Sequence, residues 1–251
     1  MPIFQRLHNY HSNRYVLTTR KNLERQNSLK SAFSGWQLEF FEGIDKGDTS
    51  KEQFESEGIY DETHARKSDR RSKAMTLGHI CCSLGHKMIY EDMLLKGYER
   101  VMIFEDDAYP LLENESLIEE ALDEFPTDAE LIYWGWHGNE VRPFFSGAKQ
   151  LLYNLQHFVG LEKYNHQMIK NLYPRPYNKS FARAGKHFCA HAYTLTKTGA
   201  ERLIRWQTPI TYNADNAIMY AILNGDLRGY VSHTKFFGQT SLERITQPLT
   251  A

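Results

Sequence analysis

Apolar and polar positions along the chain predict strands and helices that follow one another in turn. Residues 15–18 form a short β-prone run, and residues 22–33 after it are rich in helix formers. Residues 36–41 are a second, aromatic strand candidate that ends near Gly43, where a turn can form. This opening predicts a βαβ unit, and hence two parallel strands.

The middle of the chain contains the clearest helix and the clearest strand. Residues 46–73 are charged and poor in large aliphatic residues, so we expect a loop-rich excursion with at most short helices. From Thr76 apolar residues recur at helical spacing, which predicts a helix that ends at Gly97. Residues 101–104 are an unbroken apolar run, typical of a strand buried on both faces, and three acids follow at once.

The same alternation continues toward the C-terminus. Helices are expected at 117–125 and at 215–224, the second stopped by Gly225, and strands at 131–134 and 192–195. Residues 198–201 have the spacing of a capping box, which predicts another helix after them. Residues 136–190 differ in character, with one apolar helical stripe over 151–159 and a proline-containing loop after it. We therefore expect one α/β domain over residues 1–251 with a mostly parallel sheet, and a variable lid or acceptor region at 136–190.

Composition narrows the function without naming it. The 251 residues are 41% hydrophobic and carry a net charge of −1, so a single core is expected and no global field would attract nucleic acid. Three cysteines without a CxxC pair indicate neither a disulfide framework nor a cysteine zinc site. No signal-peptide pattern or run of roughly 20 apolar residues is present, so we expect a cytoplasmic protein and leave peripheral membrane contact open.

The acids at the end of the apolar strand are the main candidate chemistry. Ligands bind open α/β sheets at the carboxyl ends of parallel strands. Glu105 and Asp107 are two residues apart, which on an extended chain places both carboxylates on one face, able to share a divalent cation, while Asp106 points elsewhere. Three consecutive carboxylates repel one another, which favours a bound positive group over a merely solvated turn.

Several segments together resemble glycosyltransferase family 25, which includes lipopolysaccharide sugar transferases and collagen galactosyltransferase-like enzymes. The similar segments are 15–20 with Arg25, 78–86, 101–108, 129–135, 192–203, Asp215 and 239–241. The most specific is 101–108, a hydrophobic strand plus Glu-Asp-Asp. The resemblance implies a GT-A fold, a UDP-sugar or similar donor, usually Mn²⁺ (or Mg²⁺), and an inverting transfer to a hydroxyl of a glycan, a lipid-linked glycan or a protein.

The chain also departs from the family pattern in the segment 78–86. His79 stands where the family often has Glu, Cys81 replaces Gly, and Gly85 replaces Ser. These departures keep open a catalytically inactive sugar- or protein-binding module on the same fold. A nucleotidyltransferase is a further alternative, although the glycine-rich phosphate-binding segment usual near its first strand is missing from the sequence.

The catalytic and metal-binding roles fall on few residues. We expect Glu105 and Asp107 to hold the cation, with His233 completing its shell because His ligates Mn²⁺ acceptably; an ordinary exposed histidine is the alternative. Asp215 is the candidate base that removes the proton from the attacking hydroxyl, against a simple helix N-cap. Asp215 and Asp107 are thus the predicted catalytic pair.

Donor contacts are expected from several parts of the chain. The predicted donor-binding residues are Thr18, Arg20, Arg25, His86, Glu105, Asp106, Gln239 and Ser241. A basic pair beside the first strand can meet a diphosphate, and His86 can hydrogen-bond phosphate or sugar, with packing as its alternative role. His187, Cys189 and His191 alternate as on one strand face; lining of the acceptor cleft is favoured over a zinc site because no fourth ligand is evident.

Overall fold

The computed structural model describes residues 4–69, 72–138 and 141–243. The strands are β1 (Arg14–Thr18), β2 (Glu39–Glu42), β3 (Arg100–Glu105), β4 (Ala108–Pro110), β5 (Leu131–His137), β6 (Arg175–Pro176), β7 (Phe181–Arg183), β8 (Phe188–Thr196), β9 (Gly229–Ser232) and β10 (Phe237–Gln239). The helices are α1 (Gln5–Tyr10), α2 (Leu23–Ala32), α3 (Lys51–Ser56), α4 (Glu62–Ser68), α5 (Leu77–Leu95), the 3₁₀ helix η1 (Leu112–Leu117), α6 (Ile118–Asp123), α7 (Ser146–Phe158), α8 (His166–Lys170), α9 (Lys197–Trp206), α10 (Ala214–Asn224) and α11 (Thr240–Glu243).

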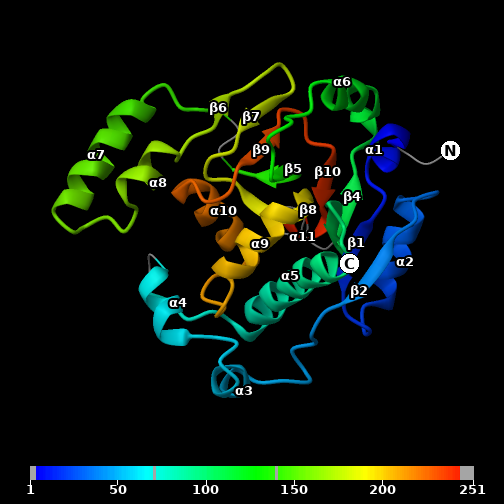
Figure 1. Cartoon of the computed structure of the whole chain (residues 1–251), viewed down its shortest axis with the longest axis horizontal. Helices are drawn as coiled ribbons and strands as arrows, with labels where there is room; N and C mark the ends of the chain where they lie inside the picture. Colours follow the sequence, from blue (N-terminus) through cyan, green and yellow to red (C-terminus); the bar gives the residue numbers. More distant parts are fainter. Residues whose placement is uncertain (1–3, 70–71, 139–140, 244–251) are drawn as a thin grey trace, which may run out of the picture.

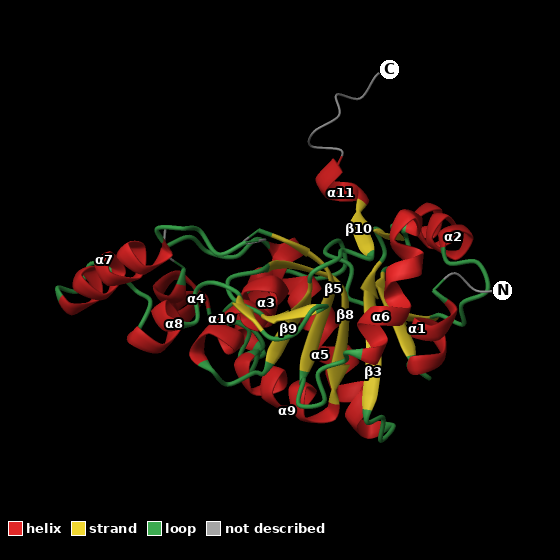
Figure 2. Ribbon diagram, turned by 90° about the horizontal axis from the view of Figure 1, so that it is seen from above, coloured by secondary structure: helices red, strands yellow, loops and turns green. Residues whose placement is uncertain are grey.

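A mixed eight-stranded sheet forms the centre of the described chain, in the order β2-β1-β3-β8-β5-β9-β7-β6, with helices on both sides (Figures 1 and 2). Strands β2, β1 and β3 are mutually parallel, as are β5 and β9. Strand β8 runs antiparallel to both β3 and β5, and β7 runs antiparallel to β9. The predicted α/β class and the parallel opening are confirmed, and the sheet is more mixed than expected because an apolar pattern does not encode strand direction.

Strand β3 is buried on both faces, as its unbroken apolar run predicts. Val101 and Ile103 pack in the core that includes residues of α5, α9 and α10. Met102 and Phe104 face the opposite core, which includes residues of α1, α2 and α6. The alternation of side chains along an extended strand explains this division, and it fixes the position of Glu105 at the strand's end.

Two helix ends lie where the sequence predicts them, and a third does not. Helix α5 begins after Thr76, where the sequence predicts its start, and the Thr76 hydroxyl caps it by accepting from the His79 N–H at 3.2 Å. Helix α10 ends at Gly225, whose φ of 85° lies in the left-handed region that glycine adopts easily. The prediction for α9 was wrong, because Thr196 and not Thr198 caps it, and the helix begins at Lys197.

Two predicted segments have different bounds or a different role. The aromatic segment 36–41 forms a strand only from Glu39, because Trp36 is buried against Phe33 and Phe104 instead of joining the sheet. The region 136–190, expected to be a variable lid or acceptor region, also contributes to the sheet, since β7 pairs with β9. Within the described residues no helix combines the length and apolarity needed to cross a membrane.

A short second sheet brings the C-terminal part of the described chain to the acids. Strand β4 follows Asp107 directly and pairs antiparallel with β10, so that Gln239 lies opposite Ala108. Helix α11 continues from β10, and the Thr240 N–H donates to the Asp107 carbonyl at 3.0 Å. Residues more than 130 positions apart in sequence therefore meet at the end of β3.

Candidate functional site

The acidic end of β3 opens into a cleft of about 450 Å³. The cleft is lined by the end of β1, the first residues of α2, the first turns of α5 and the three acids themselves. A larger cavity, of about 580 Å³, lies between α4 and α9. We place the site in the smaller cleft because its acids converge, whereas Asp61 in the larger cavity caps α4 through the His64 N–H.

Glu105 and Asp107 meet at a single amide group. The Gln239 Nε2 donates to Glu105 Oε2 at 3.0 Å and lies 3.2 and 3.3 Å from the two carboxylate oxygens of Asp107. Ser241 also hydrogen-bonds the Asp107 side chain. The structure thus brings these four predicted residues together, with the two carboxylates on one side of the chain.

Asp106 points to a different set of partners. Its carboxylate accepts from Thr18 Oγ1 at 2.9 Å, from Asn22 Nδ2 at 3.0 Å and from the Arg25 guanidinium at 2.9 Å. Thr18 ends β1 and Asn22 precedes α2, so the βαβ opening positions all three donors. Arg20 is not among them: its exposed guanidinium pairs with Glu42.

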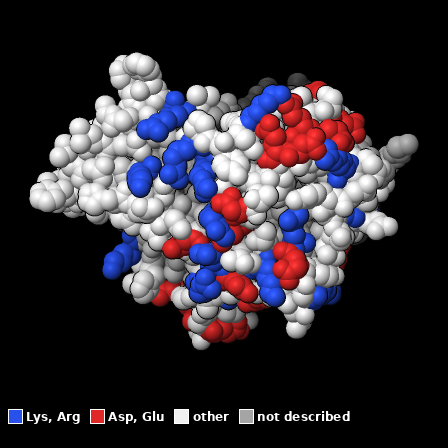
Figure 3. All heavy atoms as spheres, turned by 45° about the horizontal axis from the view of Figure 1, so that its top comes forward, with Lys and Arg blue, Asp and Glu red and all other residues white. Residues whose placement is uncertain are grey.

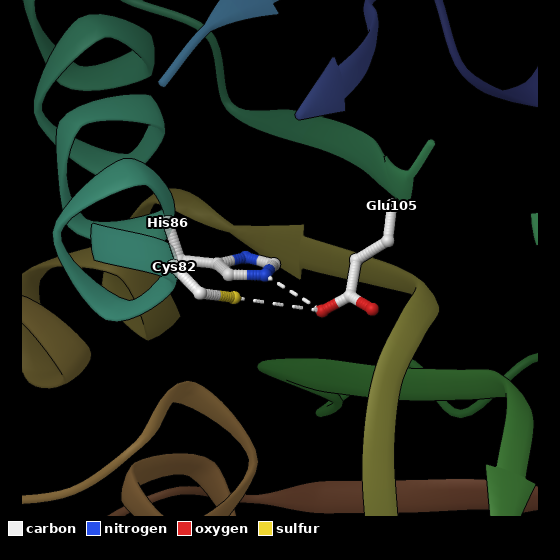
Figure 4. A group of neighbouring side chains, drawn as sticks. All are labelled: Cys82, His86 and Glu105. Carbon is white, nitrogen blue, oxygen red and sulfur yellow. Dashed lines mark hydrogen bonds and ion pairs between the residues drawn. The ribbon is translucent and has the colours of Figure 1, made fainter. Parts of the chain in front are cut away.

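Side chains of α5 contact the Glu105 carboxylate, as Figure 4 shows. Cys82 and His86 lie one turn apart on α5, with Cys82 Sγ 3.9 Å and His86 Nε2 3.2 Å from Glu105 Oε1. The second nitrogen of His86 hydrogen-bonds the Tyr193 hydroxyl at 2.8 Å, and that hydroxyl contacts the Tyr90 hydroxyl at 2.8 Å. Because a carboxylate only accepts, Nε2 carries a proton, and His86 orients Glu105 toward the cleft.

Burial and neighbouring charges set the ionisation of this cluster. Burial acts to raise the pKa of Glu105, but the hydrogen bond and charge of His86 outweigh it, so the pKa lies below its ordinary value. Burial, and then the charge of Glu105, raise the pKa of Asp107. Burial followed by the same acids raises the pKa of the Cys82 thiol well above its ordinary value, so the thiol stays protonated. Glu105 and Asp107 thus form a pair of carboxylates stabilised mainly by hydrogen bonds.

The donor chemistry of this pair fits a divalent cation. Carboxylate oxygens are the ligands that Mg²⁺ and Mn²⁺ favour, and the two carboxylates converge on one amide NH₂ group, whose hydrogens carry partial positive charge. Within the described residues, His86 and Cys82 also lie with Glu105 close enough to group around an ion. His86 is buried, whereas Cys82, Glu105 and Asp107 line the cleft.

Asp215 lies near this cluster without being the cap of its helix. Asn213 caps α10, whereas the buried Asp215 carboxylate accepts from the backbone N–H groups of Cys189 at 3.1 Å and Ala190 at 2.8 Å. Burial, and then the negative charge of Glu105, raise the pKa of Asp215 to about 6. Its carboxylate also stabilises Cys189, whose φ of 73° is uncommon for a residue with a side chain.

Two sets of predicted histidines are placed differently from expectation. The left-handed backbone at Cys189 breaks the alternation of His187, Cys189 and His191, so these three do not line one strand face. His233 does not line the acidic cleft: it is exposed and lies in a small pocket beside α6 with Glu120 and Lys179. The structure therefore places His233 in a different pocket from Glu105 and Asp107.

Several lining residues were not predicted from the sequence, among them Asn22, Lys46 and Cys82. The sequence placed Asn22 only in the helical segment 22–33, Lys46 only in the loop-rich segment 46–73, and Cys82 only in the segment 78–86. For Cys82 a signal existed, because its spacing of four from His86 places both side chains on one helix face. For Asn22 and Lys46 the signal is tertiary. Asn22 follows β1 and joins the cleft when β1 pairs with β3, and Lys46 follows β2, which pairs with β1.

Comparison with known proteins agrees with this geometry. Residues 11–218 match the family described as "Glycosyltransferase family 25 (LPS biosynthesis protein)". A protein of Aedes aegypti named "Glycosyltransferase 25 family member" is 30% identical over 96 residues, which span 37% of this chain and 16% of that relative. The matched region includes β1, α5, the acidic end of β3 and Asp215, and it ends before Gln239. The chain therefore belongs to glycosyltransferase family 25.

Proposed function

We propose that this glycosyltransferase moves a sugar from a nucleotide diphosphate sugar, such as a UDP-sugar, to an acceptor hydroxyl with inversion, using a divalent cation. The observation that carries the proposal is the convergence of Glu105 and Asp107 on the Gln239 amide at the mouth of a cleft. The proposal includes a GT-A-type fold for the chain, with residues 136–190 facing the acceptor.

Each part of the cleft then has a role. Glu105 and Asp107 would hold Mn²⁺ or Mg²⁺, which when bound neutralises the charge on the leaving diphosphate. Arg25 and Lys46, which both line the cleft, supply positive charge for the same diphosphate. Asp106, fixed by its three donors, contacts the ribose or the donor sugar, and His86 keeps Glu105 in place.

The reaction itself is a single displacement. The acceptor oxygen forms a bond to the anomeric carbon while the bond from that carbon to the diphosphate oxygen breaks, which inverts the configuration. The hydroxyl proton passes to Asp215, whose buried carboxylate is near Glu105 in the same electrostatic cluster. The nucleotide diphosphate leaves with the electron pair of the broken bond.

The test uses purified protein and nucleotide release. We expect donor turnover with Mn²⁺, and its loss with EDTA. Asp107→Asn should lower turnover by roughly a thousandfold and weaken Mn²⁺ binding in titration calorimetry, because one carboxylate ligand is lost. His233→Ala, outside the cleft, should keep Mn²⁺ affinity within about twofold. Full turnover in Asp107→Asn, or turnover unaffected by EDTA, would reject the cation assignment, and a protein that binds donor without release would be a binding module.

The donor itself can be identified by stability. A ligand that binds only the folded state raises the apparent melting temperature, by an amount that grows with its concentration over Kd. A thermal-shift screen of nucleotide sugars in the presence of Mn²⁺ should therefore show one base and one sugar that stabilise most. A nucleotidyltransferase would instead respond to nucleoside triphosphates.

A further inference from the structure

Helix α7 presents its apolar side to solvent and its polar side to the protein. The exposed fractions are 95% for Phe144, 59% for Leu155, 85% for Phe158 and 79% for Leu161. The other exposed apolar side chains of the segment are Val141, Phe145, Leu151, Leu152 and Val159. An amphipathic helix on the surface of a protein normally buries its apolar stripe against the core. No described part of the chain covers the apolar stripe of α7.

The polar side of the helix is what attaches it to the body. Gln150 Nε2 donates to the Ile169 carbonyl at 2.6 Å, and Asn154 Oδ1 lies 2.5 Å from His166 Nδ1. These contacts fix α7 against α8 and orient the apolar stripe outward. Figures 1 and 2 show α7 projecting at one end of the molecule, beyond the edge of the sheet.

The charged side chains of this segment are mostly basic. Residues 141–190 contain a single acid, the buried Glu162, whereas the chain as a whole has a net charge of −1. Two of the eight basic residues pair with acids outside the segment, Lys179 with Glu120 and Arg183 with Asp128. The other six are Arg142, Lys149, Lys163, Lys170, Arg175 and Lys186. In Figure 3 the lobe at the left is almost entirely uncharged, with Lys and Arg at its base. Two such surfaces repel each other, which disfavours pairing of two copies through α7.

We propose that α7 and its flanks, residues 141–161, dock the protein onto an anionic lipid bilayer. The helix has 13 residues, too short to span a bilayer but long enough to lie in its interface with the apolar side down. The exposed Arg142, Lys149 and Lys170 side chains, which lie just before α7, on it and on α8, then face the negative headgroups, and each adds to the attraction. A protruding apolar ridge suits a bilayer surface, into which its side chains can insert without a matching groove.

The test measures partitioning onto vesicles of phosphatidylcholine with or without phosphatidylglycerol. The wild type should bind the anionic vesicles at least about tenfold more tightly, and less so in high salt. The triple variant Phe144→Ser, Leu155→Ser, Phe158→Ser should bind about tenfold or more weakly, because three side chains lose burial. The double variant Lys149→Glu, Lys170→Glu should lose the preference for anionic lipid.

Matched controls separate docking through α7 from non-specific adsorption of apolar side chains to the vesicles. Leu95→Ser removes an apolar side chain that is 87% exposed elsewhere, at the end of α5, and should leave partitioning unchanged. All replaced side chains are exposed, so melting temperatures should match the wild type within about 2 °C. Equal partitioning of the wild type and the triple variant would overturn the proposal. So would light scattering that shows a wild-type dimer which the triple variant dissociates, because a second copy or another protein would then cover the stripe.

Discussion

The Gln239 side chain donates to Glu105 at 3.0 Å although the two residues are 134 positions apart in sequence. The pairing of β10 with β4 makes this contact, because it sets Gln239 opposite Ala108, three residues after Glu105. The same amide reaches Asp107. One neutral group therefore separates two carboxylates that would otherwise face each other.

Replacing Gln239 by Ala should destabilise the protein without metal. Hydrogen bonds to charged groups contribute about 1.5–3 kcal/mol, so the melting temperature should fall by roughly 4–10 °C. Mn²⁺ should raise the melting temperature of the variant more than that of the wild type, since in the variant no amide separates the two carboxylates. Gln53→Ala, at an exposed residue of α3, is the control. Equal Mn²⁺ shifts in wild type and variant would contradict the role given to the amide.

Arg25 and Arg20 offer a matched pair for testing the donor contacts. Arg25 lies in the cleft and binds Asp106, whereas Arg20 pairs with Glu42 outside it. We expect Arg25→Ala to raise the KM for the donor by about tenfold or more, because a charge-assisted contact to diphosphate is lost. Arg20→Ala should leave KM within about twofold. Steady-state kinetics on both variants decide the point, and equal effects would show that the cleft is not where the diphosphate binds.

Asp215→Asn should affect stability and rate separately. Each oxygen of the carboxylate accepts a hydrogen bond from a backbone N–H, whereas an amide has only one acceptor oxygen. The variant should therefore lose about 1.5–3 kcal/mol of the free energy of unfolding. If Asp215 takes the proton of the acceptor hydroxyl, kcat should also fall by about 10²–10⁴-fold, measured well below the melting temperature of the variant. A variant that is less stable but keeps its kcat would make Asp215 a positioning residue for β8.

His11 should make the protein sensitive to acid. It is buried, with Nδ1 on the Leu7 carbonyl and Nε2 on the Thr194 hydroxyl. Burial, with smaller effects from Arg100 and Arg14, lowers its pKa from 6.5 to about 3. Between these values the unfolded chain binds a proton that the folded protein does not, so stability is complete above pH 6.5 and falls as the pH drops.

The size of the His11 effect follows from one proton. In urea unfolding, His11→Asn should reduce the dependence of unfolding free energy on pH by about 1.4 kcal/mol per pH unit between pH 6 and 4. The amide can still donate to the Leu7 carbonyl, so the variant should remain folded at neutral pH. Identical slopes for the two proteins would mean that His11 is protonated in the folded state.

The sequence predicted the parts of the fold that local patterns encode. The apolar run of β3, the start of α5 after Thr76 and the Gly225 stop are each decided within a few residues, and the structure confirms them. It could not predict that β8 runs antiparallel beside β3, or that Trp36 leaves its strand for the core. Strand direction and burial depend on contacts between distant residues, which a local pattern does not contain.

The candidate site divides in the same way. The period of an extended chain placed Glu105 and Asp107 together and Asp106 apart. The position of His233 could not be obtained from such spacing, because it depends on how the chain turns between β9 and β10. The positions of Asn22 and Lys46 in the cleft likewise depend on tertiary pairing, of β1 with β3 and of β2 with β1.

The ribbon of β4 and β10 also imposes an order on events during synthesis. A nascent chain that has emerged as far as α10 already contains all three acids, His86 and Asp215, but nothing yet donates to Glu105 and Asp107 from the far side. The two carboxylates must wait for β10 before their charges are separated. A growing polypeptide therefore lacks the amide between its two carboxylates until its last described strand has left the ribosome.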